Sequence, residues 1–429
     1  MEFFDYKHGR LFCEGVDVHA IADEFGTPTY VYSRAAVLKR YHDMAEAFAP
    51  AQPLICYSVK SNSNLALMRS LKDAGSGFDV VSAGELFRAL TIGADPQKIV
   101  FAGVGKRADE IAYALDRGIL MFNVESVAEL EAINRIAGDK GAVAEVALRI
   151  NPDVDAKTHK STTTGTKENK FGIGLAITRE ILGKLSRLRH VKWTGIHLHL
   201  GSPIYSVDPY VKAVRKVARL LPEFTQTGSE LQYLNIGGGY CMSYTGEDVI
   251  GPQDYAAALL PLVAKTGLRL LMEPGRFIAA AAGALLTRII YHKTSDHGKR
   301  FVIVDASMTD LIRPALYGSF HRIWPVNCAS GMPAVVKDGE KPKFRGKLDV
   351  YDVVGPVCES TDYLGLKRYL PRTAAGDLLA VFDAGAYGTT MSSNYNTRPR
   401  PCEVLVGGQE PKLVRRRETF ADIIAPEIW

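Results

Sequence analysis

The sequence is short of cysteine and has no long hydrophobic run. Its six cysteines form no CxxC pair and no zinc-ligand spacing, which excludes a disulfide-stapled scaffold and a zinc ribbon. No stretch of about 18 apolar residues occurs, and residues 1–5 carry neither a basic start nor an apolar core of signal-peptide length. We therefore expect a cytoplasmic protein with no membrane partner.

Charge of one sign is also scarce. The formal net charge is +5 over 429 residues, and the basic residues are scattered except in the run 412–417. Because no aromatic residues interleave this run, it fits a solvated strand edge better than a nucleic-acid site. What the chain has in quantity is hydrophobic residues, at 47%. Its length is enough for about two or three domains.

Between residues 33 and 283 the sequence alternates short apolar runs with amphipathic helical patterns. The predicted strands are 54–59, 78–81, 99–102, 121–124, 144–150, 192–200, 233–236 and 269–272. Ser82 with Glu85, and Ser126 with Glu129, have the spacing of capping boxes and mark two helix starts. Eight such units in about 250 residues predict a (β/α)8 TIM-type barrel. A doubly wound open sheet is the alternative, because counting strands does not show closure.

The segments on either side have a different pattern, with predicted strands and few long helices. Residues 284–429 contain the predicted strands 285–292, 301–305, 347–354, 377–382 and 402–406 without long helices between them, which predicts an all-β C-terminal domain. Residues 1–32 contain the predicted strands 9–14 and 29–32 around a helix at 18–25, and we expect them to join that domain. The long polar loop 151–170 is either a lid or a solvated excursion.

Polar residues gather where the predicted barrel strands end. Lys60 follows the first strand, where a partly desolvated amine can condense with an aldehyde; a lysine that snorkels into water is the alternative. The other residues at strand ends are Asp79, Arg149, His197, His199, Ser202, Gly237, Gly238, Gly239, Glu273, Gly275 and Arg276. Because the carboxyl ends of barrel strands form one rim, these residues are expected to converge.

Three of these features have a chemical and a structural reading. The glycines after the seventh strand either let backbone amides approach a phosphate or only make a sharp turn. His197 and His199 share one strand face and suit a metal, but no carboxylate or third histidine nearby in the sequence completes a set. A ring stacked on a flat cofactor, with no metal, is the preferred use. Glu273 needs a cationic partner, either a pyridinium nitrogen or Arg276.

Three candidates lie in the C-terminal segment. Cys358 and Glu359 in GPVCES place an acid beside a carboxylate, which suits proton delivery, although a buried structural cysteine is the usual case. Arg313 and Tyr317 are one helical turn apart and suit a carboxylate. Tyr387 lies in the glycine-rich stretch DAGAYG. For Arg313, Tyr317 and Tyr387, a surface loop without a ligand is the alternative.

Together these motifs resemble the fold-type III, pyridoxal-phosphate-dependent amino-acid decarboxylases. The likeness runs from Tyr30 to Arg417 through YSVKSN, FDVVSAGE, NKFG, HLHLGS, GGGY, EPGR, GPVCES and DAGAYG. The resemblance implies a (β/α)8 barrel followed by a β domain that recruits the N-terminal strands, pyridoxal 5'-phosphate as cofactor, and a head-to-tail homodimer with shared active sites.

The resemblance also implies roles for individual residues. Lys60 matches the lysine that forms the Schiff base, His199 the residue stacked on the ring, and Glu273 the partner of the ring nitrogen. Further cofactor-binding positions are Asp79, Arg149, Ser202, Gly237, Gly238, Gly239, Gly275, Arg276 and Tyr387, and substrate-binding positions are Arg276, Arg313, Tyr317, Glu359 and Tyr387. Cys358 matches the proton donor, which enters the partner's barrel with Glu359. Ser58 and Ser61 stand where alanines are common, and Ser161 stands where the lid often has an aromatic residue.

Within this family, Arg313, Tyr317 and Glu359 favour a substrate with a distal carboxylate. The resemblance then implies conversion of meso-2,6-diaminopimelate to L-lysine and carbon dioxide. A sibling decarboxylase of ornithine, arginine or carboxynorspermidine is the alternative. GPVCES argues against an alanine racemase, and the joint presence of Lys60, Glu273 and Cys358 argues against a non-catalytic regulatory homologue.

Overall fold

The computed structural model describes residues 3–154, 170–226, 229–246, 248–334, 336 and 338–428. The chain forms two compact units. One comprises Arg40–Cys241 and Val249–Phe277, and the other Met1–Lys39, Met242–Asp248 and Ile278–Trp429. Most of the predicted lid loop, including Ser161, lies outside the described residues. Within the described ranges, no helix is both long and apolar enough to cross a bilayer.

The first unit is a closed barrel. Eight parallel strands pair in the order β10-β11-β12-β5-β6-β7-β8-β9, which confirms the (β/α)8 prediction over the open sheet. Their bounds are β5 Leu54–Ser58, β6 Gly77–Val80, β7 Ile99–Phe101, β8 Met121–Val124, β9 Ala144–Arg149, β10 Val191–His197, β11 Tyr233–Asn235 and β12 Arg269–Met272. The sixth strand ends at His197 rather than at residue 200, so His199 lies in the loop that follows it.

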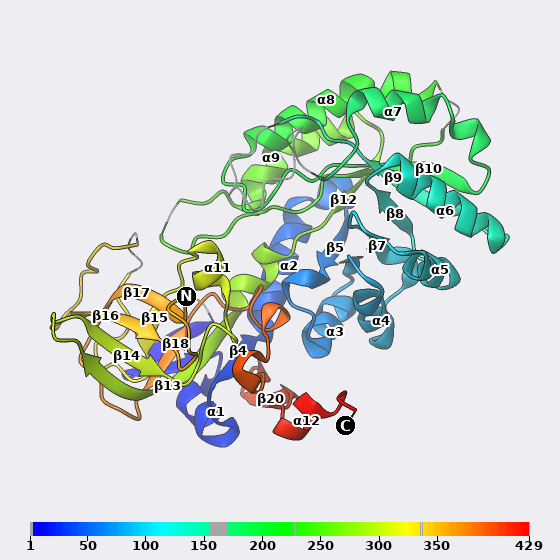
Figure 1. Ribbon diagram of the computed structural model, residues 1–429. Helices are drawn as coiled ribbons and strands as arrows, with labels where there is room; N and C mark the ends of the chain where they lie inside the picture. The colour runs from blue at the N-terminus through cyan, green and yellow to red at the C-terminus, as the bar shows by residue number, and fades with distance from the viewer. Residues whose placement is uncertain are drawn as a thin grey trace. The chain divides into compact units, whose positions relative to one another are not determined.

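Helices cover the outside of the barrel (Figure 1). They are α2 Arg34–Ala47, α3 Leu65–Asp73, α4 Ala83–Thr91, α5 Ala108–Asp116, α6 Val127–Asp139, α7 Leu175–Leu182, α8 Asp208–Thr225, α9 Pro252–Ala264 and α10 Arg276–Ala279. The predicted capping signals begin α4 and α6: the Glu85 and Glu129 amides donate to Ser82 and Ser126 at 3.2 and 3.1 Å. The Glu85 carboxylate accepts from the Val81 amide, one residue before the cap.

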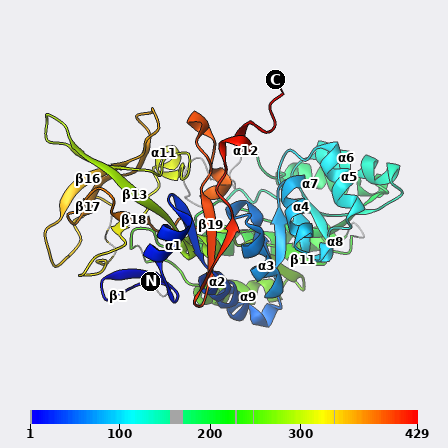
Figure 2. The same ribbon diagram turned by 90° about the horizontal axis from the view of Figure 1, so that it is seen from below.

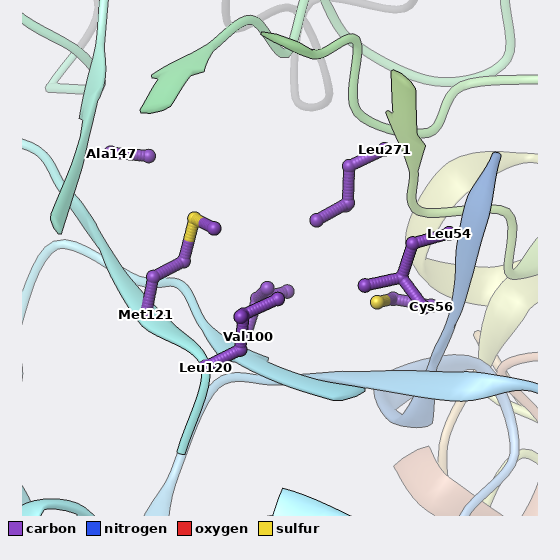
Figure 3. Close-up of a cluster of buried hydrophobic side chains, with 7 residues drawn as sticks. All are labelled: Leu54, Cys56, Val100, Leu120, Met121, Ala147 and Leu271. Atoms are coloured by element: carbon purple, nitrogen blue, oxygen red, sulfur yellow. The ribbon is translucent and has the colours of Figure 1, made fainter. Parts of the chain in front are cut away.

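The base of the barrel is apolar because alternate residues of each strand point inward. The inward-facing cluster consists of Leu54, Cys56, Val100, Leu120, Met121, Ala147 and Leu271. Figure 3 shows these side chains directed from several strands into the same space. Leu271 is fully buried there, so truncating it to alanine is expected to cost about 2–5 kcal/mol of stability. This packed layer supports the polar residues that lie above it.

The second unit is built on a nine-stranded sheet. Its order is β17-β16-β14-β13-β4-β19-β20, with β15 and β18 paired off this path. The bounds are β4 Thr29–Ser33, β13 Gly283–Thr294, β14 Arg300–Val304, β15 Ile323–Pro325, β16 Asp349–Val354, β17 Tyr363–Leu370, β18 Leu378–Val381, β19 Cys402–Gly407 and β20 Glu410–Arg415. Figure 2 shows the long strand β13 with β16 and β17 to one side and β19 to the other. The predicted basic strand edge is β20, which lies at the end of the sheet.

The N-terminal segment contributes one strand, β4, to the interior of this sheet. β4 lies between β13, to which it is antiparallel, and β19, to which it is parallel. β1 (Phe4–Lys7), β2 (Arg10–Cys13) and β3 (Val16–Asp17) form a separate three-stranded sheet, followed by α1 (Val18–Phe25). This unit also contains the helices α11 (Arg313–Tyr317) and α12 (Phe420–Ile424). The strand predicted at 9–14 also meets this unit, because the Leu11 amide donates to the Val326 carbonyl at 2.9 Å and the Cys328 amide donates to the Gly9 carbonyl at 2.7 Å. The N-terminal strands therefore join the β-rich unit, as predicted.

Candidate functional site

A polar layer lies two residues beyond the apolar one along the barrel strands. Since side chains alternate, the inward position after Leu271 is Glu273 and the one after Met121 is Asn123. The polar layer consists of Ser58, Asp79, Asn123, Arg149, His197, Asn235 and Glu273, all of them buried. The parallel register places His197 opposite both Arg149 and Asn235. The carboxyl end of the barrel is therefore lined by polar groups, as the rim argument predicted.

Glu273 is the centre of this layer. Its Oε1 accepts hydrogen bonds from Asn123 Nδ2 at 2.8 Å and Asn235 Nδ2 at 2.6 Å, and its Oε2 lies 3.2 Å from His197 Nε2. Burial by itself raises the pKa of this carboxyl, but His197, His199 and the amide of Asn235 lower it more. The resulting pKa lies well below the ordinary value, so Glu273 is a fixed negative charge.

Arg276, the other partner considered for Glu273, is engaged elsewhere. Its Nε donates to Ser202 Oγ at 3.3 Å. Arg276 and Ser202 are thus brought together, as expected for two residues of an anion site. His197 Nε2 at 3.2 Å and His199 Nδ1 at 4.0 Å are the basic groups within salt-bridge distance of Glu273 Oε2 among the described residues.

His199 is held as a neutral ring. The Gly238 amide donates to its Nδ1 at 3.2 Å, so the ring proton is on Nε2. Burial, followed by the positive charges of Arg149 and Lys60, lowers the pKa of His199 well below its ordinary value. Arg149 also donates to the His199 carbonyl at 3.3 Å and pairs with Glu125 at 2.8 Å. These contacts fix the position of His199, which lies beyond the end of β10.

Lys60 lies in a short turn directly after β5, over a buried carboxylate. Its Nζ is 3.7 Å from Asp79 Oδ2, and its side chain is 39% exposed. Ser58 donates to the same Oδ2 at 2.6 Å, whereas the buried Asp79 Oδ1 has no hydrogen-bond partner in the described part of the chain. Burial and then the charge of Glu273 raise the pKa of Asp79 to about 6.

The two serines that depart from the family pattern are accommodated. Ser58 bonds Asp79, and Ser61 Oγ bridges Tyr57 Oη at 2.9 Å and the Ser58 carbonyl at 2.8 Å. Both hydroxyls are buried and both are satisfied. Serine is therefore compatible with the turn that carries Lys60.

The three glycines after β11 are required by close backbone contacts. A Cβ at Gly237, Gly238 or Gly239 would lie 2.4, 2.3 or 2.4 Å from a carbonyl oxygen of Leu198, Glu273 or Gly201, respectively. Gly237 and Gly239 also have φ values of +71° and +101°.

The amides of these glycines are only partly available to a ligand. Those of Gly237 and Gly238 donate to Asn235 Oδ1 and His199 Nδ1. No acceptor for the Gly239 amide is found among the described residues. Gly239 packs against Gly201, whose neighbour in the chain, Ser202, bonds to Arg276. Gly239, Ser202 and Arg276 therefore offer a set of hydrogen-bond donors for an anion.

The layer also contains a potential metal cluster. Ligand atoms of His197, His199 and Glu273 lie within 4.8 Å of one another, so a carboxylate that is distant in the sequence joins the two histidines in space. The reason is that β10 and β12 flank β11, which brings residues far apart in sequence to one place. However, Glu273 and His199 already have hydrogen-bond partners from Asn123, Asn235 and Gly238. The cluster is therefore a hydrogen-bonded network as it stands.

The second unit holds the remaining predicted residues. Arg313 and Tyr317 are the first and last residues of α11; Arg313 is buried, and its Nη1 lies 3.0 Å from His321 Nε2. Tyr387 is half-buried in a turn and has a φ of 56°.

Cys358 is exposed, which excludes the reading of a buried structural cysteine. Its turn is well fixed: the Val357 amide donates to Asp362 at 2.6 Å, and Tyr395 donates to Glu359 at 2.8 Å. Glu359 is exposed as well. The turn therefore presents a thiol and a carboxylate at the surface.

Several residues of the site were not predicted. These are Asn123 and Asn235, which hold Glu273, Glu125, which holds Arg149, and His321, which contacts Arg313. The signal for the two asparagines was available: each is a polar residue two positions after an inward apolar or aromatic one in a buried strand.

The barrel layer fits pyridoxal phosphate by the chemistry of its groups. Lys60 offers an amine for the aldehyde, His199 a flat neutral ring, and Glu273 an anion for the ring nitrogen. Gly239, Ser202 and Arg276 offer donors for a phosphate. The unpartnered Asp79 Oδ1 leaves a buried polar atom beside the lysine for a further contact.

Comparisons with known proteins agree with this chemistry. Residues 34–280 match the family described as "Pyridoxal-dependent decarboxylase, pyridoxal binding domain". The diaminopimelate decarboxylase of Haemophilus influenzae is 44% identical, covering 100% of this chain and 99% of that protein. The Helicobacter pylori diaminopimelate decarboxylase complexed with L-lysine superposes with a TM-score of 0.88 at 38% identity, covering 96% of this chain and 99% of that one. For the M. jannaschii enzyme in co-complex with L-lysine the TM-score is 0.90 at 36% identity, with coverages of 100% and 98%. The chain belongs to the family of pyridoxal-phosphate-dependent decarboxylases that includes the diaminopimelate decarboxylases.

Proposed function

We propose that this chain decarboxylates meso-2,6-diaminopimelate and releases L-lysine and carbon dioxide. The observation that carries the reaction type is Glu273, a buried carboxylate held ionised by two amides and a histidine within reach of His199 and below the rim that carries Lys60. The substrate is supported by relatives that carry this activity in their names and by two solved relatives with L-lysine bound.

Bound pyridoxal phosphate supplies an electron sink for the pair of electrons left when the carboxylate departs. Glu273 would keep a proton on the ring nitrogen, because the pKa of Glu273 is too low for it to take that proton at neutral pH. Asn123 and Asn235 bind Oε1, and His197 Nε2 lies 3.2 Å from Oε2, so the carboxylate is fixed in orientation. His199, neutral and fixed by Gly238, would offer its ring to the cofactor without adding charge.

Lys60 would supply the amine that holds the aldehyde carbon, and Asp79 lies 3.7 Å from that amine. Gly239, Ser202, Gly275 and Arg276 would hold the phosphate. Arg149 supports this wall of the site by holding the His199 carbonyl.

The residues of the second unit are assigned to the substrate. Arg313 and Tyr317, with Tyr387 and Glu359, read the amino-acid centre that is retained, and Cys358 delivers the proton to the carbon that has lost its carboxylate. Because Cys358 and Glu359 are exposed on a fixed turn, they suit a site completed by a second copy of the chain, as a homodimer with shared sites. We place the enzyme in the cytoplasm, where amino-acid biosynthesis takes place.

The test is to incubate the purified protein with meso-diaminopimelate and to measure carbon dioxide and L-lysine, with ornithine, arginine and carboxynorspermidine in parallel. Release from ornithine, arginine or carboxynorspermidine but not from diaminopimelate would assign the chain to a sibling activity. Bound cofactor without release from any of them would indicate a regulatory binder. Lys60→Ala is the matched control, and it is expected to fold without the near-visible absorbance of the lysine-bound cofactor.

A further inference from the structure

Arg313 is a buried cation with no carboxylate within salt-bridge distance in the described part of the chain. Arg313 is only 4% exposed, and it forms no ion pair with an aspartate or glutamate among the described residues. Asp383 pairs with Arg322 at 3.5 Å, and the charge of Arg313 acts on it only from beyond salt-bridge distance. Burying a guanidinium without a close carboxylate is costly, so the geometry favours an anionic ligand that binds it directly.

His321 holds this guanidinium in a defined way. His321 Nδ1 lies 2.9 Å from the Phe382 carbonyl, which can only accept, so Nδ1 carries the proton. Arg313 can only donate, so His321 Nε2, 3.0 Å from Nη1, must be the acceptor. His321 is fully buried and is therefore one neutral tautomer with both nitrogens engaged.

The backbone around this contact is rigid. His321 precedes β15, which pairs antiparallel with β18, and the Phe382 amide donates to the Arg322 carbonyl at 2.8 Å. The Tyr244 ring covers the guanidinium, with Cζ at 5.1 Å from its centroid, and meets the His321 ring edge to face. Arg313 is thus fixed by a ring face and by one hydrogen bond.

We propose that His321 is a positioning residue for substrate recognition. It accepts one of the five N–H groups of Arg313 and aims the others at the carboxylate that the reaction retains. A carboxylate in place of His321 would orient Arg313 equally well, but it would cancel the charge that attracts the substrate. A neutral imidazole orients the guanidinium and leaves that charge intact. This inference rests on the proposed function, because it requires a substrate with a second carboxylate.

Two substitutions separate the two hydrogen bonds of His321. His321→Asn keeps an amide donor near the Nδ1 position for Phe382 but has no atom that reaches Arg313. His321→Gln places an amide oxygen near the Nε2 position, where it accepts from Arg313. The ligands are L-lysine, which retains the carboxylate, and 1,5-diaminopentane, which lacks it, measured as inhibitors beside KM and kcat for meso-diaminopimelate.

For His321→Asn we expect KM to rise and L-lysine binding to weaken by about tenfold, because a hydrogen bond to a charged group is lost. Binding of 1,5-diaminopentane and kcat should stay near wild type, and His321→Gln should bind L-lysine better than His321→Asn does. Melting temperatures and cofactor absorbance control for folding. If His321→Asn does not fold, retention of L-lysine binding by His321→Gln is the expected result.

Equal weakening of both inhibitors in His321→Asn, or loss of L-lysine binding in a folded His321→Gln, would overturn the inference. The same holds if the wild-type enzyme binds L-lysine no better than 1,5-diaminopentane. Failure of the wild-type protein to decarboxylate meso-diaminopimelate is a different result, since it removes the proposed function itself.

Discussion

Replacing Asp79 by asparagine is expected to stabilise the cofactor-free protein increasingly as the pH rises. Burial and the charge of Glu273 raise the pKa of Asp79 from 3.8 to about 6 in the folded state. Between these two values the folded protein retains a proton that the unfolded chain has lost. Ionised Asp79 therefore lowers the stability of the folded state. That cost is small below pH 4 and complete well above pH 6.

The size of the effect follows from the interval between the two pKa values. About two pH units at about 1.4 kcal/mol each give about 3 kcal/mol in total. About half of this, or about 1.5 kcal/mol, develops between pH 5 and pH 8. Asparagine cannot ionise and avoids the cost, while its side-chain oxygen can still accept from Ser58.

The assay is urea unfolding of the cofactor-free wild type and Asp79→Asn at several values between pH 5 and pH 8. At each pH the unfolding free energy of the wild type is subtracted from that of Asp79→Asn. The test is how this difference changes with pH, because the lost contact with Lys60 shifts its absolute value. Asp73→Asn removes a carboxylate that is 54% exposed and serves as the control. A difference for Asp79→Asn that is constant, or that falls as the pH rises, would refute the reasoning.

Three further predictions concern the site. Glu273→Gln keeps the shape but not the charge, so kcat is expected to fall by about a hundredfold or more with the cofactor still bound; an unchanged kcat would contradict the role of Glu273. Gly238→Ala places a Cβ 2.3 Å from the Glu273 carbonyl oxygen and should cost about 1–3 kcal/mol and weaken cofactor binding in a fluorescence titration. Gly105→Ala, which meets nothing within 4 Å, is its control. Mixing inactive Lys60→Ala with inactive Cys358→Ala should restore about a quarter of the activity if two copies share their sites, and nothing if each copy works alone.

The strands of the barrel could be predicted because each is a short apolar run between turn and capping signals. Ser82 and Ser126 begin helices as their spacing indicates. Closure could not be predicted, because it depends on β12 pairing with β5, and no local pattern encodes that contact. β17 was missed because Lys367, with a φ of 52°, and Arg368 interrupt its apolar pattern.

The site was predicted less completely than the fold, for a related reason. Lys60, His199 and Glu273 stand out as polar residues at strand ends. Asn123 and Asn235 look ordinary in sequence, and their importance lies in meeting Glu273 across separations of 150 and 38 residues. In the sequence, His321 is an isolated histidine with no motif around it. Its contact with the Phe382 carbonyl depends on the pairing of β15 with β18.

The central place of β4 has a consequence for how the protein is made. The ribosome releases Thr29–Ser33 early, but its two neighbours begin at Gly283 and Cys402. A strand with both edges unsatisfied must therefore wait while the entire barrel segment is translated, and such strands are prone to pair wrongly. We expect the barrel to mature first and the β sheet to close only as the last tenth of the polypeptide emerges. A nonsense mutation before residue 402 would leave β4 without its second neighbour, β19.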